Sequence, residues 1–396
     1  MKQNFVQKFM QLCKKSDERA NMDKKKYLMQ YDCIIGDEHR VWYIASRFSS
    51  LMEIDRITGE AKELLSLKKE GQYRTLIKDE NRLLLFPAGQ GHLWTYDIMA
   101  RKTLSYPIPD MVFRKERNWS AKYIRLGNCV YFSWASPVIV RYDLSGGEWK
   151  IMTEWRKLLP KDCLYENWFQ NEAFFYDGFL YFQIGTSQML LKLNPNRNEF
   201  NVMSFQISEM VKSIRNLTVS DGELWIECLN IDGTVSIYRC KDWNTLQCEK
   251  VYDFNKDTAG NGDIKLFSIM ERIGDNLLLL PGSHDKAYLL NVHDRVVHRT
   301  DCFPTVPCDS LRPDWFSAFN YYKGLRLKGT FLTIHSWTHQ LIEADIDGVE
   351  VRKIPITFSD EILDRVIKRE FENKRTCNES EDLFDLGSFI HYVLSQ

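Results

Sequence analysis

The sequence has little net charge and no pair of cysteines spaced as metal ligands. Its 53 basic and 54 acidic side chains leave a formal net charge of −1. Proteins that bind DNA or RNA usually carry a basic face, so we expect no nucleic-acid partner. The ten cysteines include no Cys-x-x-Cys pair, which gives no sign of a zinc cluster. Several lie in strand-like runs, as Cys129 does in "NCVYFSW", and we expect them to be small buried hydrophobic residues.

Long apolar runs are also missing. No run approaches the length of about eighteen apolar residues that a membrane span needs. The first 30 residues are charged throughout and lack the apolar segment of a secretory signal. We therefore expect a cytoplasmic protein with no membrane span. There is no Gly-rich phosphate loop and no Gly-x-Ser-x-Gly motif, so we expect no cofactor.

Aromatic residues, in contrast, are abundant, and a strand pattern recurs along the chain. Phe, Trp and Tyr make up 13% of the residues and favour strands. The segment "LLLFPAGQGHLWTYD" (83–97) returns as "LLLLPGSHDKAYLLN" (277–291), with the same spacing from Pro to the final Asp or Asn. Five more copies begin at Arg40, Cys129, Phe179, Glu223 and Thr330. Such recurrence predicts a repeat fold.

Each copy leads to a turn at which Asp or Asn recurs. The seven equivalent positions are Asp55, Asp97, Asp143, Asn194, Arg239, Asn291 and Asp345. They are 42 to 54 residues apart, a period typical of propeller blades. An Asp or Asn side chain can bond the backbone two residues on and so open a tight reversal. Arg239 departs from the pattern, which predicts a different outer turn in the fifth unit.

A further strand precedes each copy. "DCIIG" and "NLTVSDG", for example, precede the first and fifth copies and end in turn residues that suit a hairpin. Four strands in each of seven units, with no clear helix between them, predict an all-β fold. The expected architecture is a seven-bladed β-propeller of four-stranded antiparallel blades, with short α-helical N- and C-terminal extensions. We place the N-terminal helical extension at 1–29, the propeller at 30–358 and the C-terminal helical tail at 359–396.

In its architecture the pattern resembles the kelch and PQQ-like propeller superfamilies. Kelch repeats carry a Gly-Gly pair and a downstream Trp, and the third unit has Gly146, Gly147 and Trp149. The histidine and Trp-Asp signatures of WD repeats are absent. The resemblance therefore implies the fold, and it implies no catalytic or binding residue.

The C-terminal tail has two interpretations. The segment "SEDLFDLGSFIHYVLSQ" (380–396) spaces its apolar residues as an amphipathic helix does. This helix either packs on the propeller or docks into a groove of a partner protein.

Ligands of propellers usually bind at the mouth of the central channel, which is an argument by analogy with the fold. The loops between the second and third strands line that mouth, and His284, His335 and His339 fall in those of the sixth and seventh units. If these histidines converge, they form a metal site or a general acid–base pair. The alternative is that they point into water.

The loops between units carry a second recurrence, in which a Trp stands just before an innermost strand and a basic residue lies near the entry point. The residues are Trp119, Trp168, Trp315, Arg74, Lys122 and Arg215. Aromatic faces with basic and amide neighbours suit a sugar ring. Alternatively, each Trp packs between adjacent blades and seals the ring.

These observations favour a non-catalytic binding module or scaffold that recognises a glycan, a peptide or a protein partner at the channel mouth. The alternative is a lyase or hydrolase of the propeller type that uses the loop histidines with a divalent metal. The absence of a catalytic motif favours the binding module, and whether the protein is an enzyme stays open.

Overall fold

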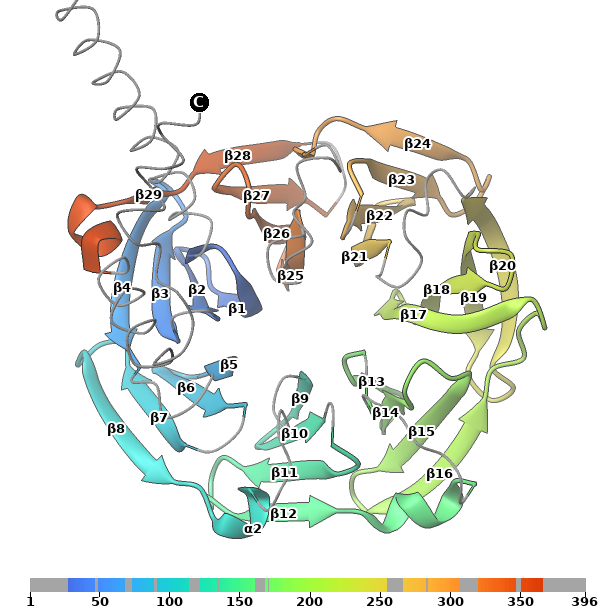
Figure 1. Ribbon diagram of the computed structural model, residues 1–396, viewed down its shortest axis with the longest axis horizontal. Coiled ribbons are helices and arrows are strands. Elements are labelled where there is room, and N and C mark those ends of the chain that lie inside the picture. Colours follow the sequence, from blue (N-terminus) through green and yellow to red (C-terminus); the bar gives the residue numbers. More distant parts are fainter. Residues whose placement is uncertain are drawn as a thin grey trace, which may run out of the picture. The chain divides into compact units, whose positions relative to one another are not determined.

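Seven antiparallel sheets are arranged around a common centre in the computed structural model of the chain (Figure 1). The structure describes residues 28–46, 49–67, 73–88, 91–113, 122–133, 136–160, 168–169, 171–254, 266–282, 284–306, 320–346 and 350–365. In each sheet, four strands that are consecutive in sequence follow one another from the centre outwards. The predicted seven-bladed β-propeller is thereby confirmed.

The strands of the first four blades are β1 (Tyr31–Gly36), β2 (Arg40–Ala45), β3 (Ser50–Asp55), β4 (Glu60–Ser66); β5 (Tyr73–Asp79), β6 (Arg82–Pro87), β7 (His92–Asp97), β8 (Lys102–Pro107); β9 (Lys122–Leu126), β10 (Cys129–Ser133), β11 (Ile139–Asp143), β12 (Trp149–Met152); β13 (Phe174–Tyr176), β14 (Phe179–Gln183), β15 (Met189–Asn194) and β16 (Glu199–Ser204). Two short helices, α2 (Asp110–Phe113) and η1 (Glu154–Leu158), follow β8 and β12.

The strands of the last three blades are β17 (Val211–Ser220), β18 (Glu223–Asn230), β19 (Val235–Asp242), β20 (Gln247–Phe254); β21 (Phe267–Ile273), β22 (Asn276–Pro281), β23 (Ala287–Asn291), β24 (Val297–Thr300); β25 (Tyr321–Leu327), β26 (Thr330–His335), β27 (Gln340–Asp345) and β28 (Val351–Pro355). All seven predicted innermost strands are present, as β1, β5, β9, β13, β17, β21 and β25.

The turn from the third to the fourth strand uses the predicted side-chain chemistry. Asp55 Oδ1 accepts the backbone N–H groups of Ile57 and Thr58, each at 2.9 Å. The same pair of bonds recurs at Asp97, Asp143, Asn194 and Asn291. These bonds satisfy amides that the tight reversal leaves without a strand partner.

The prediction that the fifth blade departs from this turn was wrong. Its third strand ends at Asp242, three residues beyond Arg239. Asp242 Oδ1 accepts the N–H of Asn244 at 2.9 Å, and Oδ2 accepts the Thr245 hydroxyl at 2.7 Å. The strands β17 to β20 have eight to ten residues, which moves the turn outwards by three residues.

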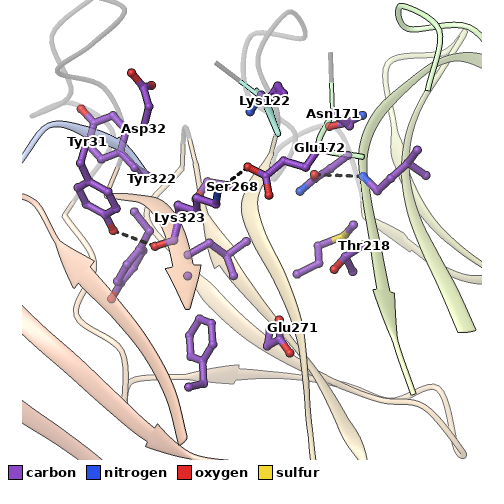
Figure 2. Close-up of a pocket in the computed structure, with 17 residues that line it drawn as sticks. Tyr31, Asp32, Lys122, Asn171, Glu172, Thr218, Ser268, Glu271, Tyr322 and Lys323 are labelled. Carbon is purple, nitrogen blue, oxygen red and sulfur yellow. Dashed lines mark hydrogen bonds and ion pairs between the residues drawn. The ribbon is translucent and has the colours of Figure 1, made fainter. Parts of the chain in front are cut away.

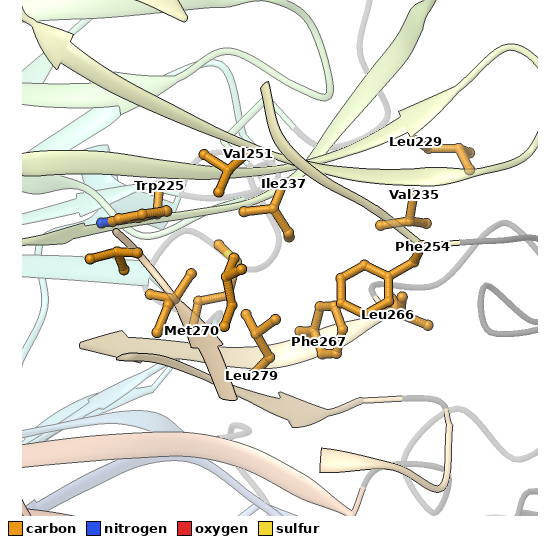
Figure 3. Packing of buried hydrophobic residues seen from close by; sticks show 13 residues of the cluster. Trp225, Leu229, Val235, Ile237, Val251, Phe254, Leu266, Phe267, Met270 and Leu279 are labelled. Carbon is orange, nitrogen blue, oxygen red and sulfur yellow. The ribbon is translucent and has the colours of Figure 1, made fainter. Parts of the chain in front are cut away.

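The hydrophobic core lies between adjacent blades. Between the fifth and sixth blades, Trp225 and Ile237 pack with Met270 and Leu279, all buried (Figure 3). Because an inner strand has a neighbouring blade on both faces, it reads as an almost continuous apolar run, as in Leu277–Leu280. The burial of these runs is the main source of stability of the ring.

The first and last blades each have four strands of their own, and the ring closes through a fifth strand, which follows the seventh blade in sequence and pairs with β4 of the first blade. Thr357 of the two-residue strand β29 (Thr357–Phe358) donates its N–H to the Gly59 carbonyl at 3.0 Å. Gly59 has φ +74°, and a Cβ atom there would lie 2.0 Å from the Pro355 carbonyl oxygen. This close approach of two backbones explains a glycine at the position.

The chain divides into two compact units, residues 26–357 and a second one that includes residues from Phe358 onwards. In the second unit, residues 360–365 are helical and the N–H of Ile362 approaches Ser359 Oγ at 3.4 Å. The remainder of the two predicted helical extensions lies outside the described residues. In the described part of the chain, no helix has the length and apolarity to cross a membrane.

Candidate binding site at the channel mouth

A pocket of about 310 Å³ lies between the innermost strands (Figure 2). Every blade except the second contributes to its described lining, and most of the contributing residues stand at or near the start of an innermost strand. The lining residues are Tyr31, Asp32, Lys122, Asn171, Glu172, Asn216, Leu217, Thr218, Ser268, Ile269, Met270, Glu271, Tyr321, Tyr322, Lys323, Gly324 and Phe331. The innermost strands begin where the loops between blades end, so the pocket opens at the predicted mouth.

An ion pair between Lys323 and Glu172 joins two blades that are not neighbours. Lys323 Nζ on β25 lies 2.6 Å from Glu172 Oε1, just before β13. Figure 2 shows both side chains between Tyr31 and Asp32 on one side and Asn171 on the other. Burial alone would lower the pKa of Lys323, but Glu172, with smaller effects of Cys33 and Asp32, outweighs it and the pKa is raised. Lys323 therefore stays an ammonium group.

Neutral groups hold Lys323 in place. Its carbonyl accepts the Tyr31 hydroxyl at 2.8 Å and the Thr333 hydroxyl at 2.9 Å. Its Nζ lies 5.3 Å from the ring centroid of Tyr123, within the range of a cation–π contact.

The Cys33 thiol lies beside the Tyr123 ring, and its Sγ bonds the Leu76 carbonyl at 3.2 Å. Burial raises the pKa of this thiol.

Two other carboxylates of the lining are neutralised by arginines. Asp32 Oδ2 lies 3.6 Å from Arg74 Nε and accepts the Ser46 hydroxyl at 3.1 Å. Glu271 Oε1 lies 2.7 Å from Arg326 Nη1. Burial raises the pKa of Glu271, and Arg326 opposes that change. Arg74, a predicted binding residue, is 8% exposed and forms this ion pair with Asp32.

Lys122, the first residue of β9, differs from the other charged residues of the lining. It is half-buried and lines the pocket, yet no described side chain lies within ion-pair or hydrogen-bond distance of its ammonium group.

Arg215, another predicted binding residue, lies on β17 beside the lining residue Asn216. Two of the six predicted loop residues, Trp119 and Trp315, lie outside the described residues.

Trp168 lies in the core between the third and fourth blades. It is 8% exposed, and its ring centroid is 5.8 Å from that of Trp155, which is fully buried. Arg156 lies 5.9 Å from the Trp168 ring centroid. The faces of Trp168 are therefore not offered to a ligand in the channel, and the residue packs between the blades.

His335 is bonded at both ring nitrogens within the protein. Its Nδ1 accepts the N–H of Thr338 at 3.1 Å, and its Nε2 lies 3.1 Å from Asn320 Oδ1. Asn320 in turn donates its Nδ2–H to the His284 carbonyl at 2.9 Å. The Nε2–H of His335 is thus the donor to Asn320, and no lone pair is left for a metal. Burial, with a smaller effect of His339, lowers the pKa of His335 to about 3.

His284 is also held neutral. Its Nδ1 accepts the N–H of Lys286 at 3.2 Å, and its ring meets that of Phe267 edge to face at 5.1 Å. Burial lowers its pKa to about 4. His339 occupies the β26–β27 turn with φ 52°. Within the described ranges, no group of three His, Cys, Asp or Glu side chains is placed to hold a metal ion.

Sequence reasoning did not find the apolar pair at the mouth. Ile231, in the loop between β18 and β19, donates its N–H to the carbonyl of Met210 at 2.8 Å. Their side chains are 65% and 51% exposed. Each stands alone in a polar loop, so a search for apolar clusters in sequence passes over both. Glu172 and Lys323 were missed because neither belongs to a motif.

Comparison with known proteins supports the fold and leaves the activity open. No family model and no curated protein matches the chain. It is similar to the solved structure described as "YCF48 bound to D1 peptide", with TM-score 0.51 and 13% identity over 76% of this chain and 88% of that one. YCF48 from Cyanidioschyzon merolae aligns with TM-score 0.51 and 11% identity over 81% and 94% of the two chains.

A streptogramin B lyase structure aligns with TM-score 0.50 and 12% identity, over 76% of this chain and 89% of that one. At such identities the likenesses show the fold alone, which is a seven-bladed β-propeller.

Proposed function

We propose that this chain is a non-catalytic β-propeller that binds a peptide segment of a protein partner at its channel mouth. The observation that carries the proposal is Lys122, a cation of the pocket lining that no described acidic side chain neutralises. An ammonium group in a half-buried position gains most from a ligand that supplies the missing anion. The ligand group is therefore a carboxylate, from an acidic side chain or from the end of the peptide.

The size of the pocket agrees with a small inserted group. A volume of about 310 Å³ is at the lower end of the range of about 300–1,000 Å³ that is usual for ligand sites. It suits one or two side chains of a longer ligand better than a whole globular surface. The ion pair of Lys323 with Glu172 belongs to the same lining as Lys122 and gives the ligand a polar wall.

The exposed pair Met210 and Ile231 favours a protein ligand over a free small molecule. Both residues lie in loops at the same end of the channel as Lys122. Glu209 and Asp232, their neighbours in sequence, are exposed, so the apolar pair has polar neighbours. Apolar side chains inside a polar rim are typical of surfaces that bind proteins.

Four of the titratable groups near the pocket favour binding over catalysis. A general acid or base works best with a pKa near the operating pH. The pKa values of His284 and His335 are lowered to about 4 and about 3, whereas those of Lys323 and Cys33 are raised. None of these four groups exchanges protons readily near neutral pH. The likeness to a structure with a bound peptide agrees with this proposal but, as a likeness of fold, does not carry it.

The test is a screen of the purified chain on an array of acidic peptides, each with a free and with an amidated C-terminus. A binding peptide is then titrated against wild type and Lys122→Ala by calorimetry. We expect the dissociation constant to rise about tenfold or more, because a charge-assisted hydrogen bond is worth about 1.5–3 kcal/mol.

Lys150→Ala is the matched control, since Lys150 is an exposed lysine on the outermost strand of the same blade. It leaves the dissociation constant unchanged. The proposal is wrong if no peptide binds, or if the two variants bind a selected peptide equally well. A parallel thermal-shift screen with glycans and divalent metals tests the other two hypotheses, because a ligand of the native state raises its melting temperature.

A further inference from the structure

Two cysteines face each other on the two outer strands of the fifth blade. Cys240 on β19 and Cys248 on β20 are direct cross-strand partners. The other cysteines of the described strands pair with residues of other types; Cys129, for example, lies opposite Asp143 and Leu126. The Cys240–Cys248 pair is independent of the channel mouth and of the proposed function.

The backbone hydrogen bonds show which kind of pair this is. Partners in an antiparallel ladder either exchange two N–H···O bonds or exchange none. The N–H of Cys248 points away from β19, because it donates to the Gln206 carbonyl at 2.9 Å. Cys240 and Cys248 are therefore a non-hydrogen-bonded pair. The Cα atoms of such pairs are about 4.5 Å apart, within the range of about 4.4–6.8 Å that a disulfide spans.

Both thiols belong to the same hydrophobic cluster, and each bonds a backbone carbonyl. Cys240 Sγ bonds the Asp242 carbonyl at 3.4 Å, and Cys248 Sγ bonds the Leu246 carbonyl at 3.3 Å. Cys240 is fully buried, whereas Cys248 is partly exposed on the outside of the blade. A small solute can therefore reach the pair through Cys248.

Each thiol also affects the ionisation of the other. The neighbouring Cys248 thiol lowers the pKa of Cys240 against the opposing effect of burial, whereas Cys240 and burial together raise the pKa of Cys248. A thiolate hydrogen-bonded by a neighbouring thiol is the reactive form in oxidation and exchange.

We propose that Cys240 and Cys248 are a reversible oxidation site, at which hydrogen peroxide converts the thiol pair into a disulfide across β19 and β20. Two S–H bonds and the peroxide O–O bond break, and the S–S bond forms. The sulfurs give up two electrons in all, and the two protons leave with the peroxide oxygens as two molecules of water.

The oxidised pair holds the hairpin that carries Trp243. This side chain stacks on Tyr176 of the fourth blade with centroids 4.1 Å apart, and its Nε1–H donates to the Gly222 carbonyl at 2.8 Å. The disulfide therefore secures the hairpin at the seam between the fourth and fifth blades.

The test treats the folded wild-type chain with hydrogen peroxide, alkylates the remaining thiols and digests it with trypsin without reduction. Cleavage after Arg239, Lys241 and Lys250 separates the two cysteines. We expect peptides 240–241 and 242–250 joined with the loss of two hydrogens, and released by dithiothreitol. The joined fraction is expected to be about tenfold higher than in the urea-unfolded chain, because folding holds the thiols together.

Single variants identify the partners. Cys302→Ser, which changes an exposed thiol, and Cys228→Ser, which changes a buried one on β18, keep the cross-link. Cys240→Ser abolishes it. The proposal is overturned if peroxide oxidises Cys302 in wild type without joining peptides 240–241 and 242–250. It is equally overturned if Cys248 joins Cys228, or if folded and unfolded chains cross-link alike.

Discussion

Arg56 and Glu343, 287 residues apart in the sequence, form an ion pair that links the first blade to the seventh. Arg56 Nε lies 2.8 Å from Glu343 Oε1, and the two side chains are only 13% and 11% exposed. A second nitrogen of Arg56 donates to the Asp37 carbonyl at 2.7 Å. Together with the pairing of β29 with β4, this ion pair is one of the polar contacts that close the ring.

Replacing Arg56 is therefore expected to weaken the closed ring. Arg56→Met removes the donor of the Asp37 carbonyl and leaves the Glu343 carboxylate with only Arg352, at 3.7 Å, so we expect the free energy of unfolding to fall by about 2 kcal/mol. Urea unfolding of wild type and variant measures the change. Arg40→Met is the control, because its guanidinium is 46% exposed and 3.5 Å from Glu53, and such pairs contribute about 1 kcal/mol or less. Equal losses in the two variants would contradict the assignment.

Glu227 fastens the start of the sixth blade to the fifth. It is fully buried on β18, and its carboxylate accepts the N–H groups of Leu266 at 2.7 Å and Phe267 at 3.1 Å. Glu227→Gln places an NH₂ group against one of these N–H donors. We expect a loss of about 2 kcal/mol in the free energy of unfolding, together with faster hydrogen exchange at these two amides.

Glu223→Gln, on the same strand, is the control for that experiment. Glu223 is 24% exposed, and its nearest cation is Lys241 at 3.7 Å. Its replacement is expected to leave hydrogen exchange at Leu266 and Phe267 as in wild type. A Glu227→Gln variant with unchanged exchange at both amides would show that the carboxylate does not hold this connection.

Blade number and turn chemistry are predictable from sequence because both are local. An apolar run and an Asx turn act within one hairpin, so each blade carries its own signal. The error at Arg239 arose from assuming blades of equal strand length; strands of eight residues in β18 to β20 shift the turn to Asp242. The sequence "KDWNTLQ" does contain this Asp, followed by the Asn and Thr that it bonds.

The corrected turn makes a prediction of its own. Asp242→Ala removes the acceptor of the Asn244 N–H and the Thr245 hydroxyl and is expected to lower the melting temperature. Asp242→Asn keeps an acceptor oxygen and is expected to stay close to wild type, as the natural Asn194 and Asn291 turns suggest. Differential scanning calorimetry of the two variants checks this. If Asn is as harmful as Ala, the charge of Asp242 and not its bond geometry matters.

The pocket was predictable only in its location. The start of the innermost strands was expected at the mouth, and Lys122 was among the candidate residues. The pairing of Lys323 with Glu172 depends on how the ring places residues 151 positions apart, which no local pattern encodes. For Trp168, the sequence predicted the position before an innermost strand correctly. It could not predict that the ring is covered, because that depends on packing against Trp155.

The buried histidines predict how stability depends on pH. Folding lowers the pKa of His284 to about 4 and that of His335 to about 3, from an ordinary value near 6.5. Below pH 6.5 the unfolded chain therefore takes up protons that the native chain does not. The free energy of unfolding is therefore highest above pH 6.5 and falls as the pH is lowered towards the folded pKa of each histidine. At pH 5 we expect each histidine to have lowered the free energy of unfolding by about 2 kcal/mol.

Urea unfolding at pH 7 and pH 5 tests this with matched variants. His335→Gln removes one titrating group, so its loss of stability between the two pH values is expected to be about 2 kcal/mol smaller than that of wild type. His39→Gln changes a histidine of the exposed β1–β2 turn and is expected to keep the wild-type difference. His284→Gln provides a second test if His335→Gln folds poorly. Wild-type pH dependence in both buried-site variants would show that neither histidine is held neutral by the fold.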